Sequence, residues 1–315
     1  NNFMLIRYLL CILMSTLLIA CTAPQTRTLL HQQVMLKQRP SVELNTLPFF
    51  AQDTHQCGPA ALATMLQNTG VKVLPEQLTK EVYVPKRQGS FSFEMIASAR
   101  QHGRLAYPLA PNLQAIFTAL EAGLPVLVLQ NNGLKLYPVW HFAVVVGVDY
   151  ARQEFILRSG VDRRLVVSFS TFEYTWARGN YWASLILDPT QLPAWLEADK
   201  TLQQLSILET QGLLSGAQAG YAQATQYWPT EKIAWLGLAN SSVTLGDAAK
   251  GEAAFRELIR RFPNESAGFN NLADLLLHQG RAREALAFAQ QAVKLLDIAA
   301  TQQTLTEVEA ALAQN

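Results

Sequence analysis

Residues 52–63 are Gln52-Asp-Thr-His-Gln-Cys57-Gly-Pro-Ala-Ala-Leu-Ala63, a polar stretch that leads into small apolar side chains. Proline suits the first turn of a helix, where its missing N–H leaves no donor unpaired, so Pro59 predicts a helix that begins near Cys57. Unpaired N–H groups and the helix dipole favour a thiolate at such a position. Cys57 is therefore a candidate nucleophile, and the alternative is a buried, unreactive thiol.

A second stretch, Trp140-His-Phe-Ala-Val-Val-Val-Gly147, predicts a buried strand that has His141 at its start. A histidine at this position is often purely structural. However, a cysteine at a helix start and a histidine on a strand form the pair that Cys-His peptidases need. His141 would take the thiol proton and later protonate the leaving amine. Gln52 could donate its side-chain amide to the oxyanion, together with the backbone N–H of Cys57, and Gln56 is the competing candidate.

The region around these two stretches has short helices first and strands afterwards, which predicts an α+β domain with a mostly antiparallel sheet. Three of the predicted helices run into a glycine stop, at Gly70, Gly103 and Gly123. A last helix is predicted at Ser170-Thr-Phe-Glu173, which has the pattern of a capping box. The predicted helices cover 57–69, 75–82, 92–102 and 112–122, and the predicted strands cover 125–130, 141–149, 154–158, 164–169 and 181–187.

Beyond residue 190 the pattern is entirely that of amphipathic helices, and it repeats. Gly212, Gly246 and Gly280 are spaced by 34 residues, as are Pro229 and Pro263. This period resembles the tetratricopeptide repeat, in which stacked helix pairs bury apolar faces that no pair could bury alone. We expect an all-α tetratricopeptide-repeat domain over 195–315, with about three repeats and a final capping helix; an unrelated helical bundle is the alternative.

The first residues predict an export signal. A basic residue, Arg7, precedes an apolar core that is shorter than the roughly 20 residues a membrane-spanning helix needs. The core ends in Leu18-Ile-Ala-Cys21, which resembles the lipobox of bacterial lipoproteins. The resemblance implies a signal peptide over 1–20, acylation of Cys21, a tether over 21–45 and, from Thr22, the periplasmic face of the outer membrane. An ordinary signal peptide or an uncleaved anchor is the alternative.

The stretches around Cys57 and His141 together resemble the papain-like bacteriocin-processing peptidases, which remove leader peptides after a double glycine. The resemblance covers about residues 45–187, and we place a papain-like cysteine peptidase domain at 46–190. It implies that Cys57 is the nucleophile, His141 the base and Gln52 the oxyanion donor. The family's third residue is an aspartate in an Asp-Pro pair. Here Ser159 stands in its place, so Ser159, Asp162 or a backbone carbonyl could orient His141.

Composition excludes several other classes of protein. Of the 315 residues, 50% are hydrophobic and 16% are charged, with a net charge of +1, which argues against a disordered chain and against a general nucleic-acid binder. No Gly-Lys dipeptide occurs, so the sequence contains no P-loop. His55 with Cys57 is poor evidence for a metal site, and we expect neither a metal nor a cofactor.

The expected function is that of a lipid-anchored thiol peptidase of the bacterial envelope. It would cleave a peptide or precursor protein through a Cys57 acyl-enzyme, while the repeats recruit the substrate or a protein partner. The missing Asp-Pro pair supports a different reading, a catalytically weak or inactive envelope adaptor that acts through its repeats. An amidase or a transpeptidase is a third alternative, because it would share the same acyl-enzyme.

Overall fold

The computed structural model describes residues 23–30, 36–51 and 56–314. It divides into two units. The first runs to His102 and continues over Ala106–Ile186, and the second holds Gly103–Leu105 and the chain from Leu187 onward. Within the described ranges, none of the helices combines the length and the apolar character that crossing a membrane requires.

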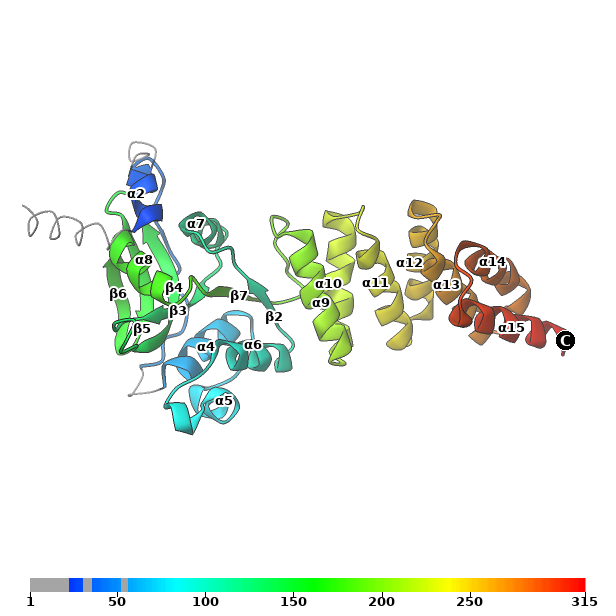
Figure 1. Cartoon of the computed structure of the whole chain (residues 1–315), viewed down its shortest axis with the longest axis horizontal. Coiled ribbons are helices and arrows are strands. Elements are labelled where there is room, and N and C mark those ends of the chain that lie inside the picture. Colours follow the sequence, from blue (N-terminus) through cyan, green and yellow to red (C-terminus); the bar gives the residue numbers. More distant parts are fainter. Residues whose placement is uncertain (1–22, 31–35, 52–55, 315) are drawn as a thin grey trace, which may run out of the picture. The chain divides into compact units, whose positions relative to one another are not determined.

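The first unit is an α+β domain, as predicted (Figure 1). Its strands lie in the order β2-β7-β3-β4-β5-β6, with β1 added on β4, and the pairs β1/β4, β3/β4, β3/β7, β4/β5 and β5/β6 are antiparallel. The helices are α2 (Pro24–Leu30), α4 (Cys57–Asn68), α5 (Pro75–Val82), the 3-10 turn η2 (Pro85–Arg87), α6 (Ser92–Gln101), α7 (Leu113–Glu121) and α8 (Phe169–Arg178). The strands are β1 (Val42–Glu43), β2 (Leu105–Pro108), β3 (Val126–Asn131), β4 (Trp140–Asp149), β5 (Glu154–Ser159), β6 (Asp162–Ser168) and β7 (Ala183–Leu187).

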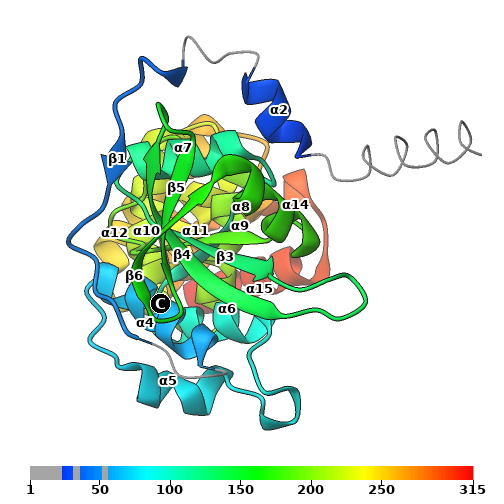
Figure 2. The same ribbon diagram turned by 90° about the vertical axis from the view of Figure 1, so that its left-hand side faces the viewer.

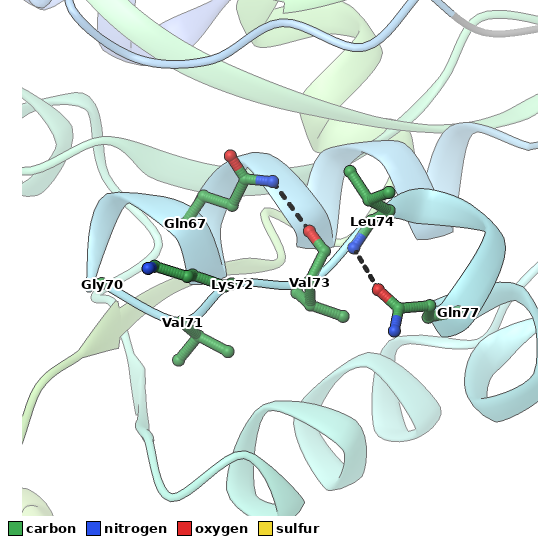
Figure 3. A pocket seen from close by; sticks show the side chains of 7 residues that line it. All are labelled: Gln67, Gly70, Val71, Lys72, Val73, Leu74 and Gln77. Atoms are coloured by element: carbon green, nitrogen blue, oxygen red, sulfur yellow. Dashed lines mark hydrogen bonds between the residues drawn. The ribbon is translucent and has the colours of Figure 1, made fainter.

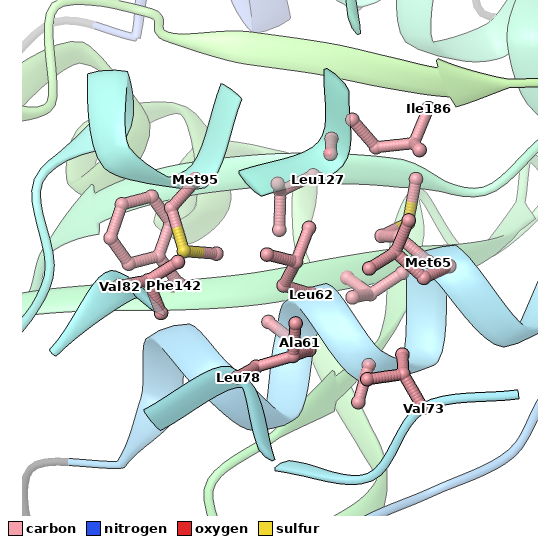
Figure 4. Packing of buried hydrophobic residues seen from close by; sticks show 14 of the residues in the cluster. Ala61, Leu62, Met65, Val73, Leu78, Val82, Met95, Leu127, Phe142 and Ile186 are labelled. Atoms are coloured by element: carbon pink, nitrogen blue, oxygen red, sulfur yellow. The ribbon is translucent and has the colours of Figure 1, made fainter. Parts of the chain in front are cut away.

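Helix α4 packs on one face of the sheet and forms the core there. Leu62, Met65 and Leu66 of α4 are buried in one cluster with Phe142 and Val144 of β4, and Figure 4 shows this packing. Burying each of these large side chains contributes about 1.5–3 kcal/mol. The cluster therefore holds the first residue of α4 in a fixed position beside the beginning of β4.

The opposite face of the sheet is covered by aromatic side chains. Phe155 of β5 stacks on Phe117 of α7 and lies against Phe169 and Phe172 of α8. Each of these rings is buried. Helix α8 is thereby fixed on the sheet on the face away from α4.

Most predicted elements are present, with their ends shifted by one or two residues. The predicted glycine stops Gly70, Gly103 and Gly123 all have positive φ, at +84°, +70° and +77°. The predicted capping box at Ser170 is wrong, because Ser168 caps α8 by accepting from the backbone N–H of Thr171 at 3.2 Å. The strands β1 and β2 and the helix α2 were not predicted, since all are short and carry no clear periodicity.

The second unit is all-helical, as predicted, and its helices follow one another in pairs (Figure 1). Gly212, Gly246 and Gly280 have φ of +77°, +85° and +76° and lie just beyond the first helix of each pair. The 34-residue period is therefore the spacing of these left-handed turns. The helices are α9 (Ala198–Thr210), α10 (Leu214–Tyr227), α11 (Lys232–Thr244), α12 (Ala248–Arg261), α13 (Ser266–His278), α14 (Ala282–Leu295) and α15 (Ala299–Ala313).

Close packing between the first two pairs depends on Gly237 of α11. A Cβ at this position would stand 2.4 Å from the ring of Tyr221. That ring is buried, and its hydroxyl donates to Glu209 at 2.9 Å, so it cannot move aside cheaply. A larger residue would separate α10 from α11.

We predict that Gly237→Ala lowers the free energy of unfolding of the helical unit by about 1–3 kcal/mol, the usual cost of overpacking. The matched control is Gly216→Ala, because the nearest atom to a Cβ there, Pro189 Cγ, is 3.3 Å away. Urea unfolding followed by circular dichroism measures both variants. Equal midpoints for the two variants would contradict the packing argument.

Candidate active site

Cys57 is the first residue of α4, as predicted, and Gln56 is its N-cap. The side chain is half-buried and its thiol is free. Its sulfur receives hydrogen bonds from the backbone N–H groups of Phe142, Gly58 and Cys57 itself. Two of these donors are the unpaired N–H groups of the helix start. The third comes from β4 and belongs to the residue that follows His141.

His141 is the second residue of β4, and its ring is bonded to the end of β5. Nε2 of His141 lies 2.8 Å from Oγ of Ser159, and Ser159 is buried. The hydrogen bond from Phe142 to the sulfur of Cys57 brings the thiol to the same end of β4. This contact engages Nε2, so Nδ1 is the ring nitrogen that does not contact Ser159.

Of the candidates for orienting His141, Ser159 is the one whose side chain contacts the ring. Asp162 is paired with Ser159 across the turn between β5 and β6, but its side chain is exposed. Of the described residues, Ser159 is the one whose side chain bonds the His141 ring. Its hydroxyl can fix the orientation of the ring, but it adds no negative charge beside it.

Burial opposes ionisation of both partners. It raises the pKa of the Cys57 thiol, against the smaller lowering effect of the three backbone N–H groups. It also lowers the pKa of His141. Both shifts favour the uncharged forms, which are a thiol and a neutral imidazole. The helix start favours a thiolate at Cys57, but burial of the side chain has the larger effect on its pKa and favours the thiol.

The residue after Cys57 must be a glycine because the space around it is occupied. A Cβ on Gly58 would stand 2.2 Å from Oγ of Ser90 and 3.3 Å from Sδ of Met95. The turn before α6 thus lies directly against the start of α4. Oγ of Ser90 is buried and has no hydrogen-bond partner within the described part of the chain. No local pattern in the sequence pointed to Ser90, because its role comes from this contact with Gly58.

Other predicted residues lie apart from the pair or beyond what is described. Gln52, His55 and Cys21 lie outside the described residues. The side-chain oxygen of Gln56 accepts from the hydroxyl of Thr79 on α5 at 3.4 Å, so it is turned toward α5. In the described ranges no three His, Cys, Asp or Glu side chains are grouped so that they could hold a metal ion.

Two surface hollows lie along α4 and α5, and only one is near Cys57. The first, of about 460 Å³, is shown in Figure 3 and is lined by residues from Gln67 to Gln77. Gln67 is ten residues after Cys57, about 15 Å along the helix, so this hollow is remote from the thiol. The second, of about 450 Å³, is lined by Gln56 and Ala60 on α4, and by Phe49, Phe50, Ala51, Pro75 and Glu76. Substrate could approach Cys57 from this side.

Part of the chain is similar to known proteins. Residues 44–183 match the family described as Peptidase_C39 like family. They form a C39-like peptidase domain. This domain contains Cys57, His141 and Ser159, and it is followed by a tetratricopeptide-like helical domain. No curated protein matches the chain significantly.

Three solved structures are similar to parts of the chain. One is a C39-like peptidase from Bacillus anthracis, with 18% identity and a TM-score of 0.41, covering 47% of this chain and 98% of that one. Another is the first TPR domain of human RPAP3, with 14% identity and a TM-score of 0.36, covering 37% and 93%. A third is the Yersinia enterocolitica secretion chaperone SycD with a YopD peptide, with 14% identity and a TM-score of 0.35, covering 37% and 92%.

We predict that alkylation of Cys57 by iodoacetamide follows a pH profile displaced upward from that of a free thiol. Because the pKa of Cys57 is raised, the thiolate fraction should grow only above the ordinary value of about 8.5. A chain beginning at Thr22 retains Cys57 as its only thiol, so labelling can be followed by intact mass. A rate that stays high and level from pH 5 to pH 8 would instead reveal a thiolate–imidazolium pair.

Proposed function

We propose that the chain is a lipid-anchored cysteine peptidase of the bacterial envelope that cleaves a peptide or precursor protein. The observation that carries the proposal is the placement of His141, whose Nε2 is bonded to Ser159 while the next residue's N–H is bonded to the sulfur of Cys57. Membership of residues 44–183 in a peptidase-like family supports it.

In the proposed reaction, Cys57 attacks the scissile carbonyl carbon while its proton passes to Nδ1 of His141. Because the resting pair is uncharged, this transfer accompanies the attack. The oxyanion would receive hydrogen bonds from the backbone N–H of Cys57 and from Gln52, whose position the structure does not describe. Collapse of the intermediate breaks the C–N bond, and His141 gives its proton to the leaving amine. Water, activated by His141, then hydrolyses the Cys57 thioester.

Ser159 sets how strongly His141 can act as a base. A carboxylate at this position would stabilise the imidazolium by charge, whereas the hydroxyl fixes the direction of the ring and can accept from Nε2–H without adding charge. We therefore expect a slower reaction than an aspartate would give, with the ring still held in one orientation. The same observation favours the second candidate, an envelope adaptor in which the peptidase body is retained without activity.

The anchor and the repeats complete the proposal. Cys21 would be acylated and would hold the protein on the periplasmic face of the outer membrane, since two or more acyl chains give stable attachment. The repeats would recruit the substrate or a protein partner, as concave surfaces of stacked helix pairs commonly bind extended peptides. On successive first helices, Asn240 of α11 and Asn271 of α13 are bonded side chain to side chain at 3.1 Å, giving this part of the unit a polar, ordered surface.

The proposal is tested by labelling the full chain with a peptidyl vinyl sulfone, which reports attack by Cys57 with proton transfer through His141. Cys57→Ala and His141→Ala should abolish specific labelling. Ser159→Ala should slow it by about tenfold, corresponding to the loss of one hydrogen bond of roughly 1–1.5 kcal/mol. Ser159→Asp should raise the pKa of His141, so that the acid side of the labelling profile moves to higher pH than in the wild type.

Asp162→Asn is the matched control, because Asp162 is paired with Ser159 but exposed. Its labelling rate should equal that of the wild type. If Cys57 in the wild-type chain reacts no faster than a free thiol, and His141→Ala leaves the rate unchanged, the adaptor is the correct function.

A further inference from the structure

The connection between β3 and β4 presents an exposed apolar surface. It spans residues 132–140, here called the hairpin arm, and Figure 2 shows it extending away from the sheet. Its only charged residue is Lys135. Five of its side chains are large, apolar and exposed: Leu134 (70%), Leu136 (87%), Tyr137 (78%), Val139 (59%) and Trp140 (40%).

The hairpin arm is held in this conformation by its own hydrogen bonds. The side-chain oxygen of the buried Asn131 accepts from the N–H groups of Gly133 and Val139, both at 2.9 Å. Across the tip, the N–H of Leu134 donates to the carbonyl of Tyr137 at 3.1 Å. Holding apolar side chains in water in an ordered loop is unfavourable, and exposed apolar patches of this kind mark interaction surfaces.

A second observation concerns the start of the described chain, where α2 is fixed on α8. Glu173 of α8 is fully buried, and its carboxylate accepts from the backbone N–H groups of Gln25 and Thr26 at 2.9 and 2.7 Å. The hydroxyl of Thr26 also donates to it at 2.7 Å. Helix α2 lies within the predicted tether of 21–45 and is therefore attached to the peptidase domain. Strand β1, in the same predicted tether, pairs with β4.

This attachment limits where a lipid on Cys21 could lie. Ala23 is two positions after Cys21, and two residues span at most about 7 Å. The side chain of Gln25 ties the same turn to α7, because its oxygen accepts from the N–H of Leu113 at 2.7 Å. An acylated Cys21 would therefore bring the bilayer close to the α2 side of the domain.

The hairpin arm and α2 are both attached to helix α8. Nε of Arg178 at the end of α8 donates to the carbonyl of Asn131, at the base of the arm, at 3.0 Å. Glu173 and Arg178 are five residues apart, about 7.5 Å along the helix. Neither residues 23–30 nor the hairpin arm contains an acidic residue, while Arg27 and Lys135 are exposed.

We propose that the hairpin arm inserts its apolar side chains into the headgroup region of the bilayer that carries the anchor. Leucine with tyrosine, tryptophan and lysine is the composition that favours this interface, and the exposed cations suit anionic lipid. The proposal rests on the proposed acylation of Cys21. It places Trp140, and with it the neighbouring His141, at the membrane surface, so the substrate would be cleaved there.

The test is tryptophan quenching in the full chain reconstituted in vesicles of phosphatidylethanolamine and phosphatidylglycerol, with and without a phospholipid brominated on its acyl chains. Brominated lipid should quench part of the emission. Trp140→Phe should remove that quenched part. Trp195→Phe is the matched control, since Trp195 is 38% exposed and Trp140 is 40% exposed, and it should leave the quenching unchanged.

Equal quenching of the wild type and Trp140→Phe would overturn the proposal. It would also fail if Trp140 stayed unquenched in vesicles but became shielded from acrylamide when a cleavable peptide was bound, because the arm would then be a substrate surface. Intact mass of the same sample reports acylation of Cys21 separately. If Cys21 is unacylated, the proposed anchor fails, and the unacylated chain mixed with the vesicles still decides the role of the arm by the same quenching.

Discussion

The burial of one face of α4 against β4 determines where the thiol of Cys57 can be. Leu62 and Met65 pack with Phe142 in a single cluster, so the first turn of α4 cannot shift along the sheet without opening that core. The same packing brings the sulfur to the N–H of Phe142, next to His141. The position of the thiol also depends on Gly58, because the turn at Ser90 occupies the space that a side chain at position 58 would need.

The two partners at this position are held in their uncharged forms by the environment that brings them together. The helix start offers N–H groups that favour a thiolate, but burial of the thiol has the larger effect on its pKa and raises it. Burial likewise lowers the pKa of His141, and Ser159 supplies no charge to offset it. We therefore expect the proton of Cys57 to pass to His141 during the attack on the substrate, and we expect no thiolate–imidazolium pair before substrate binds.

Parts of the fold that follow from local chemistry could be predicted from the sequence. Pro59 indicated the helix start at Cys57, the apolar run after His141 indicated the strand, and the 34-residue glycine spacing indicated the helix pairs. Glu173 shows what local sequence patterns cannot predict. Its spacing from Ser170 suggested a capping box, yet its carboxylate bonds Gln25, 148 positions away. The contacts of Ser90 with Gly58 and of Glu173 with α2 are between segments distant in sequence, and no periodicity or motif encodes them.

The central claim is that Ser159 holds a neutral His141 with its proton on Nε2 and with Nδ1 free to accept the proton of Cys57. Nitrogen-15 NMR of the histidine rings, assigned by His141→Gln, measures this most directly. The account predicts a neutral ring protonated at Nε2 at pH 7, with a pKa below the ordinary value of about 6.5, and the same charge state in Cys57→Ala. An imidazolium at pH 7 that disappears in Cys57→Ala would contradict it.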